Sequence, residues 1–400
     1  MTEVYSFATG ATLEFIINMT TPSYTTAYGY PQFYEEPLWL QIILALLFAV
    51  ITVLGVGGNA IVIYIVLWNR RMRTPTNYFI VNLAVSDLLA ALMCINFTYY
   101  STMYLSWPFG RFMCKLVQFI QNVSISVSIF TLVVISLDRY SVILYPLRPK
   151  LGKTKALIII FTIWICSCAF ALPVAIFTDL NFYDDLGLPP VCTEGGNWKS
   201  DKLYSFCAIA VQYVIPLLIL AVCYGRIGLV MWSRKTPGEK EEKRDKKLTE
   251  SKLKLVKMFA AIVLLFAICY LPMYVFLLVQ DHNEEIMGFE YMKLIFLGAF
   301  FFGMSNCIYN PMIYCYMNSK FRNGFKSVLW FLPCVHYVPA DQWHGYSRST
   351  MRTYAHSPPA TSPSKVVLRQ NGGGDVTTEL CNRPGWNNYH SINANGTARL

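Results

Sequence analysis

The fold of this chain is decided by residues 77–100, which read NYFIVNLAVSDLLAALMCINFTYY. A helix needs roughly 20 apolar residues to cross a hydrocarbon core about 30 Å thick, and this stretch is long enough. Asp87 lies near its middle, at a depth where a carboxylate must be protonated, paired or hydrated. The stretch therefore predicts a transmembrane helix whose polar residues face other helices and not lipid.

Six further stretches have the same character. The expected spans lie near 38–67, 77–100, 113–136, 156–178, 204–231, 255–280 and 291–315. The third and seventh carry more polar residues, which favours the interior of a bundle. Of the 400 residues, 55% are hydrophobic and only 14% are charged, whereas soluble domains carry about 25% charged residues. We expect an all-α membrane protein, a bundle of seven transmembrane helices.

The basic residues predict the orientation of the bundle. The net charge is +10, but Lys and Arg cluster in short connections between apolar runs, which favours membrane topology over nucleic-acid binding. The connections at 70–73, 148–155 and 234–257 and the segment after the last span are basic, and the opposite connections are acidic. By the positive-inside rule the amino terminus is extracellular and the carboxyl terminus cytoplasmic, as in a multi-pass protein of the plasma membrane.

This topology divides the chain into four segments. Residues 1–37 form an extracellular tail with a glycosylation acceptor at Asn18, and residues 38–317 form the bundle. Residues 318–334 form a short amphipathic cytoplasmic helix on the inner leaflet, because Phe321 and Phe325 recur at helical spacing among basic residues. Cys334 is a candidate for palmitoylation, with a free thiol as the alternative. Residues 335–400, rich in Ser, Thr, Pro, Gly and Asn, are predicted to be disordered.

Polar residues and prolines stand at fixed places within the apolar spans, where each polar residue is costly. In chain order they are Gly58-Asn59, Asn82-Leu83-Ala84-Val85-Ser86-Asp87, Cys114, Asp138-Arg139-Tyr140, Trp164, Pro216, Tyr224, Phe266, Cys269-Tyr270-Leu271-Pro272 and Asn310-Pro311-Met312-Ile313-Tyr314. This pattern resembles the rhodopsin-like G-protein-coupled receptors over about residues 58–314. One position departs from the family: Tyr270 stands where Trp is usual, and its hydroxyl needs a partner.

The resemblance implies an ion site inside the bundle. In the family, residues matching Asp87, Ser128, Asn306 and Asn310 bind a sodium ion that favours the inactive state. A protonated Asp87 in a polar network is the alternative. No other cofactor is expected.

The resemblance also implies a switch at the cytoplasmic side. In the family, a triplet matching Asp138-Arg139-Tyr140 holds the arginine guanidinium beside the aspartate carboxylate until activation releases the arginine. Pro272 and Pro311 bend their helices, so that Tyr224 and Tyr314 swing toward Arg139, and Leu147 enters the G protein. The family's receptor kinases and arrestin are expected at Ser347, Ser349, Thr350 and Thr353, with an inert tail as the alternative.

The outer side predicts a peptide ligand. The resemblance pairs Cys114 with Cys192, both in segments exposed to an oxidising compartment. Gln121 lies seven residues after Cys114, where an aminergic receptor needs a carboxylate, and Met304 occupies the place of the opsin lysine. Gln121 can exchange hydrogen bonds with a terminal carboxamide. Asp281 matches the carboxylate that neuropeptide Y receptors use for a ligand arginine, and Tyr270 and Glu194 are further candidate contacts.

Finer resemblance favours the invertebrate neuropeptide Y-like and RYamide receptors. The matching stretches are Arg73-Thr74-Pro75-Thr76-Asn77-Tyr78-Phe79, Trp107-Pro108-Phe109-Gly110, Tyr145-Pro146-Leu147-Arg148-Pro149 and Pro237-Gly238-Glu239. We expect an amidated neuropeptide ending in Arg-Tyr or Arg-Phe. Tachykinin and prokineticin receptors share parts of the pattern and are the alternative. A membrane transporter is a remote one, since no paired broken helices are seen, and an enzyme is not expected, since no His lies inside a span.

Overall fold

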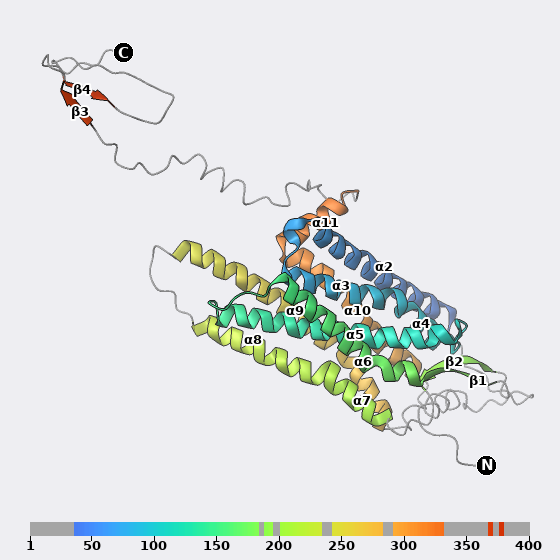
Figure 1. The fold of residues 1–400 in the computed structure, drawn as a ribbon. Helices are drawn as coiled ribbons and strands as arrows, with labels where there is room; N and C mark the ends of the chain where they lie inside the picture. Colours follow the sequence, from blue (N-terminus) through green and yellow to red (C-terminus); the bar gives the residue numbers. More distant parts are fainter. Residues whose placement is uncertain are drawn as a thin grey trace, which may run out of the picture. The chain divides into compact units, whose positions relative to one another are not determined.

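The structure is a computed structural model that describes residues 36–183, 188–194, 201–233, 242–282, 291–331, 367–370 and 376–379. Within these ranges seven helical segments are long and apolar enough to cross a membrane, and they lie side by side (Figure 1). They are α2 (Leu38–Trp68), α3 (Pro75–Met93) with α4 (Ile95–Tyr104), α5 (Gly110–Leu144), α6 (Lys153–Phe177), α7 (Asp201–Ile209) with α8 (Ile215–Ser233), α9 (Glu242–His282) and α10 (Met292–Met317). The prediction of seven spans is confirmed.

Three of the spans form the interior of the bundle. More than half of the most apolar window is buried in α3–α4 (61%), α5 (56%) and α10 (56%), against at most 33% in the others. The interior position of the third and seventh spans was predicted from their polar residues. The second span is equally interior, because its polar side chains Asn82, Ser86 and Asp87 are all buried against neighbouring helices.

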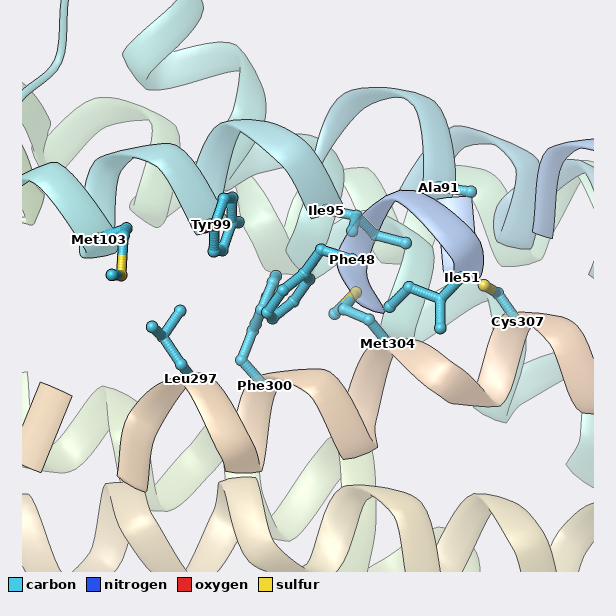
Figure 2. Packing of buried hydrophobic residues seen from close by; sticks show 10 residues of the cluster. All are labelled: Phe48, Ile51, Ala91, Ile95, Tyr99, Met103, Leu297, Phe300, Met304 and Cys307. Atoms are coloured by element: carbon cyan, nitrogen blue, oxygen red, sulfur yellow. The ribbon is translucent and has the colours of Figure 1, made fainter. Parts of the chain in front are cut away.

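The helices α2, α3–α4 and α10 enclose an apolar cluster (Figure 2). Phe48 of α2 stacks on Tyr99 of α4 with ring centroids 4.9 Å apart and on Phe300 of α10 at 6.0 Å. Leu297 and Met304 of α10 complete the contact with α4 and α2. This corner of the bundle is therefore filled by side chains.

A short helix, α11 (Ser319–Val328), follows α10 and corresponds to the predicted amphipathic helix. Asn318 caps it by accepting a hydrogen bond from the Lys320 N–H, 3.1 Å away. Phe321 and Phe325 are buried, and Phe321 lies 5.5 Å from the Tyr314 ring. The prediction placed this apolar face in the inner leaflet. In the structure these two rings pack on the protein, while Cys334 lies outside the described residues.

Two hairpins supplement the helices. Strands β1 (Thr178–Tyr183) and β2 (Leu188–Glu194) pair antiparallel between α6 and α7. In the part of the chain from 341 onward, which forms a separate unit, β3 (Val367–Gln370) pairs with β4 (Val376–Glu379). This second hairpin lies in the tail predicted to be disordered, and its β-branched residues flank an Asn-Gly-Gly-Gly-Asp stretch that is typical of a turn. A 3-10 helix, η1 (Arg70–Met72), joins α2 to α3.

Candidate functional site

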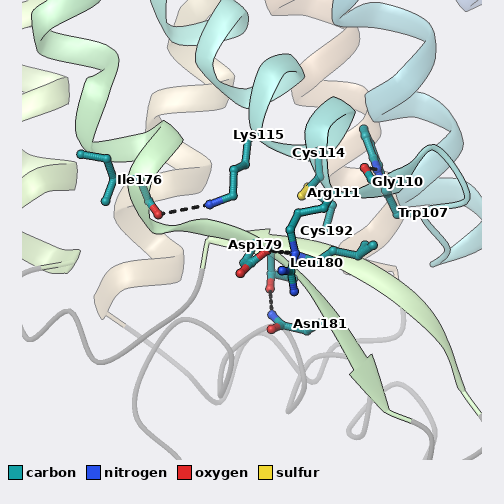
Figure 3. The surroundings of a disulfide bond; sticks show 11 residues. Trp107, Gly110, Arg111, Cys114, Lys115, Ile176, Asp179, Leu180, Asn181 and Cys192 are labelled. Atoms are coloured by element: carbon teal, nitrogen blue, oxygen red, sulfur yellow. Dashed lines mark hydrogen bonds and ion pairs between the residues drawn. A yellow bond between two sulfur atoms is a disulfide. The ribbon is translucent and has the colours of Figure 1, made fainter.

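The end of the bundle that carries β1 and β2, here called the hairpin end, is braced in several places (Figure 3). Cys114 of α5 and Cys192 of β2 form the predicted disulfide, with an S–S distance of 2.02 Å. The backbone N–H of Trp107 donates to the Pro190 carbonyl, 2.7 Å away. Arg111 forms an exposed ion pair of 2.8 Å with Asp179 of β1. The disulfide and the Trp107 hydrogen bond therefore hold the hairpin against the start of α5, while the exposed ion pair adds little.

Gln121 lies on α5, about two helical turns from the disulfide. Its side chain is half-buried, and its Oε1 atom accepts a hydrogen bond from the Thr98 hydroxyl of α4, 3.4 Å away. The predicted amide is thus placed between two spans and is oriented by one of them. Thr98 was not singled out in the sequence, although a hydroxyl in an apolar run is a usable signal.

The fifth span contains a widened turn, the π-helix η3 (Ala210–Val214), between α7 and α8. Pro216 has no N–H to continue a regular α-helix at this point. The N–H of Ile215 instead donates to the Ala210 carbonyl, five residues back. Turns of this kind are frequent at functional sites. Here two adjacent side chains, Gln212 and Tyr213, both reach neighbouring helices.

Gln212 is the centre of a buried polar network. Its Nε2 atom donates to the Ser126 hydroxyl at 2.8 Å and to the Asn122 carbonyl at 3.4 Å, both on α5. Its Oε1 atom accepts from the Tyr274 hydroxyl of α9 at 3.4 Å. Tyr213 donates to a further carbonyl of α9, 2.7 Å away. The prediction missed this connection of three spans, although an amide four residues before a proline was visible in the sequence.

Tyr270, which stands where the family usually has Trp, belongs to a row of aromatic rings on α9. Its centroid lies 4.6 Å from that of Phe266 and 6.3 Å from that of Tyr274. Tyr274 in turn lies 4.7 Å from Tyr213. The row therefore joins Tyr270 to the same side chains that surround Gln212.

The other predicted ligand contacts are placed as follows. Asp281 is half-buried in the last turn of α9. Glu194 ends β2, and its side chain lies outside the described residues, as does Asn18. Lys293, near the start of α10, is buried and pairs with Glu36 across 3.3 Å. The structure therefore places Gln121, Tyr270 and Asp281 on two helices that the Gln212 network joins.

Asp87 lies in a polar cluster in the middle of the bundle. Its Oδ2 atom accepts from Asn310 Nδ2 at 2.7 Å, and its Oδ1 atom accepts from the Ser128 hydroxyl at 3.5 Å. The Ser128 and Ser86 hydroxyls lie 2.9 Å apart. Within the described part of the chain, the buried Asn306 Oδ1 has no hydrogen-bond partner. Carboxylate, hydroxyl and amide oxygens suit a hard cation such as sodium, so these residues fit the predicted ion.

Arg139 lies near the opposite end of the bundle, here called the α11 end. Its guanidinium contacts the Asp138 carboxylate and donates through Nη2 to the Thr76 hydroxyl of α3, 2.7 Å away. The prediction included Asp138 but not Thr76. Tyr140 packs beside Tyr145, with ring centroids 6.4 Å apart.

Tyr224 and Tyr314, which are expected to move on activation, make no hydrogen bond with the Arg139 guanidinium in the described part of the chain. The Tyr224 hydroxyl accepts a bond from Ser136 on α5 at 2.9 Å. The buried Tyr314 hydroxyl has no partner among the described residues, and Pro311 lies in the same turn of α10. Leu147 is fully exposed after α5. This is an arrangement in which Arg139 is held by α5 and α3.

Comparison with known proteins agrees with this geometry. The family described as 7 transmembrane receptor (rhodopsin family) matches residues 58–314. The RYamide receptor of Tribolium castaneum is 40% identical over 301 residues, which cover 72% of this chain and 81% of that receptor. The tachykinin-like peptides receptor 99D of Drosophila melanogaster is 38% identical over 300 residues (73% and 58%). The RYamide receptor of Drosophila melanogaster is 37% identical over 315 residues (75% and 66%).

Proposed function

The chain belongs to the rhodopsin family of seven-transmembrane receptors, and from that premise we propose that it is a G-protein-coupled receptor for a neuropeptide ending in amidated Arg-Tyr or Arg-Phe. The hairpin end then faces the outside of the cell and receives the peptide. The α11 end faces the cytoplasm and activates a heterotrimeric G protein. The receptor acts in the plasma membrane.

The observation that carries this proposal is the similarity to two proteins named RYamide receptor, from a beetle and a fly, at 40% and 37% identity. It is not confined to one motif, since it covers 72% and 75% of this chain. The ligand named for those proteins is therefore the first to test on this one.

The geometry of Gln121 and Asp281 supports a peptide with an amide and a cation. Gln121 has a carbonyl and an amino group for a carboxamide, and Thr98 orients it. Asp281 carries negative charge at the carboxyl end of α9, where the helix dipole disfavours an anion. A carboxylate at such a place does not stabilise its helix, which favours a role in binding a ligand arginine.

The α11 end supports the output. Release of Arg139 from Asp138 and Thr76 would free the guanidinium for Tyr224 and Tyr314, and the exposed Leu147 is suited to enter a partner protein. We further propose that Asp87, Ser128, Asn306 and Asn310 bind a sodium ion, which supplies positive charge to a buried carboxylate. A receptor kinase and arrestin would act on the carboxyl tail.

The test is a panel of synthetic peptides applied to cells that express the full chain, with calcium and cyclic-nucleotide readouts. Peptides ending in Arg-Tyr-amide or Arg-Phe-amide should activate it, and the matching free acids should be much weaker because their terminal carboxylate has no N–H to donate and carries a negative charge. Gln121→Ala and Asp281→Ala should each reduce potency, whereas Asp179→Asn, which removes the charge of a partly exposed acid at the same end and keeps its shape, should not. Unchanged responses to every amidated peptide after both replacements would contradict the proposal.

A second candidate, a receptor for tachykinin-like peptides, is favoured by the 38% identity to receptor 99D. The same panel should include tachykinin-type peptides. Activation by these and not by Arg-Tyr-amide peptides would select the second candidate.

A further inference from the structure

A buried ion pair joins the beginning of the bundle to its last span at the hairpin end. Lys293 Nζ of α10 lies 3.3 Å from Glu36 Oε1, one residue before Pro37, the N-cap of α2. The two side chains are only 6% and 5% exposed. Charged residues are almost never buried to this extent unless they are paired.

The backbone of Glu36 is itself held in place. Gln41 Nε2 donates to the Glu36 carbonyl at 2.7 Å. The Tyr99 hydroxyl of α4 donates to the backbone carbonyl of Gln41, 3.1 Å away. The ion pair therefore ends a chain of polar contacts that runs through α4, α2 and α10. It lies next to the apolar cluster of Figure 2, which contains Tyr99, Phe48 and Phe300.

The position of α10 affects α9 at this end. Phe296 of α10 packs on Phe276 of α9 with ring centroids 5.3 Å apart. Met292, next to Lys293, belongs to the same contact. Phe276 lies a little more than one helical turn before Asp281 in α9. A change in the position of the start of α10 would thus displace the helix end that carries Asp281.

We propose that Glu36 and Lys293 are positioning residues that fix the start of α10 to α2 and thereby place Asp281 for the peptide. The inference rests on the proposed function for its second half only. Removing one partner leaves a lone charge in a buried site, which is strongly destabilising, whereas removing both charges is tolerated far better. An exchange of the two residues leaves neither charge without its partner. The pair should therefore act as a unit.

The experiment compares Glu36→Gln, Lys293→Met, the combination Glu36→Leu with Lys293→Met, and the charge exchange Glu36→Lys with Lys293→Glu. Thermal unfolding of the purified full chain in lipid nanodiscs needs no peptide. Each single change should lower the melting temperature by several degrees, because it leaves a lone charge in a buried site. Both double variants should recover most of the loss.

The second readout is the binding and response to a synthetic Arg-Tyr-amide peptide at matched surface expression. Each single variant should weaken peptide affinity by on the order of tenfold, leave the maximal response unchanged, and be rescued by the charge exchange. Arg111→Gln with Asp179→Asn removes the exposed pair at the same end and should change neither readout much.

Three results would overturn the inference. The first is a charge exchange that rescues neither the melting temperature nor the affinity. The second is a loss of affinity in the Lys293 variants alone, which would make Lys293 a direct peptide contact. The third is single variants that melt early but bind with normal affinity, which would confine the pair to folding. If the wild type responds to no peptide, the proposed function fails, while the melting comparison still tests whether the Glu36–Lys293 pair fixes α10 to α2.

Discussion

Thr76→Val is expected to raise signalling in the absence of peptide. The Thr76 hydroxyl accepts a 2.7 Å hydrogen bond from Arg139, and valine has the same shape without the oxygen. A hydrogen bond to a charged group contributes about 1.5–3 kcal/mol, which corresponds to roughly 10- to 150-fold in an equilibrium constant. Because Arg139 keeps its contact with Asp138 in the variant, we expect the lower end of this range, about tenfold. A receptor active in about 1% of molecules would become active in about 10%.

The assay is guanine-nucleotide exchange on a G protein in membranes with matched receptor amounts. Thr76→Ser keeps the hydroxyl and should behave as the wild type. Thr74→Val, which loses the N-cap of α3 two residues away, controls for loosening of the helix end. Basal exchange in Thr76→Val that equals that of Thr76→Ser would refute the argument that this hydrogen bond restrains Arg139.

Three more outcomes follow from the packing. Gly55→Ala should be less stable than Gly57→Ala by about 1–3 kcal/mol in thermal unfolding, because a Cβ at 55 would lie 2.8 Å from Cys307 Sγ whereas none lies within 4 Å at 57; equal stabilities would contradict the close packing of α2 on α10. Gln212→Leu leaves polar groups on α5 and α9 without their partner and should cost about 1–3 kcal/mol and reduce peptide efficacy, and normal efficacy would show that the network is not part of the coupling. Leu147→Ala should leave melting and peptide affinity unchanged, since the side chain is fully exposed, yet reduce nucleotide exchange; a lower melting temperature would argue against a purely external role.

The parts of the fold that could be predicted are those with a strong local signal. Apolar runs of sufficient length indicated all seven spans, and the polar residues inside them marked the neighbourhood of Asp87, where the Asn310 contact is now seen. The pairing of Cys114 with Cys192 came from the resemblance. These features depend on composition or on a recurring pattern, and both are visible in a single chain.

The features that could not be predicted depend on which distant residues meet. Thr76 and Arg139 are 63 positions apart, and nothing local in either segment indicates the contact. Lys293 was visible only as a lysine at the outer end of a span, and its burial depends on Glu36. The strands β1 and β2 are short and lie in a polar connection, where turn and strand signals are weak.

The surroundings of the apolar face of α11 were predicted only in part. Its apolar period is evident, but a period does not say which apolar surface the face will contact. In the structure Gly324 allows the approach of α11 to α2, since a Cβ there would lie 2.7 Å from the Ile65 side chain. The protein surface thus takes the place that lipid was expected to take for Phe321.

The widened turn at Ala210–Val214 has a consequence for how changes of chain length would act in the fifth span. Successive residues of an α-helix are rotated by about 100° around its axis, and a turn that holds one extra residue separates the phase of α7 from that of α8. A helical wheel drawn outward from Pro216 would therefore assign the faces of α7 wrongly. A one-residue deletion between Ala210 and Val214 would let this turn become a regular α-helical turn, so the side chains of α7 would keep the faces they have now. The same deletion in the regular part of α8 would instead rotate one part of the span by about 100° against the other.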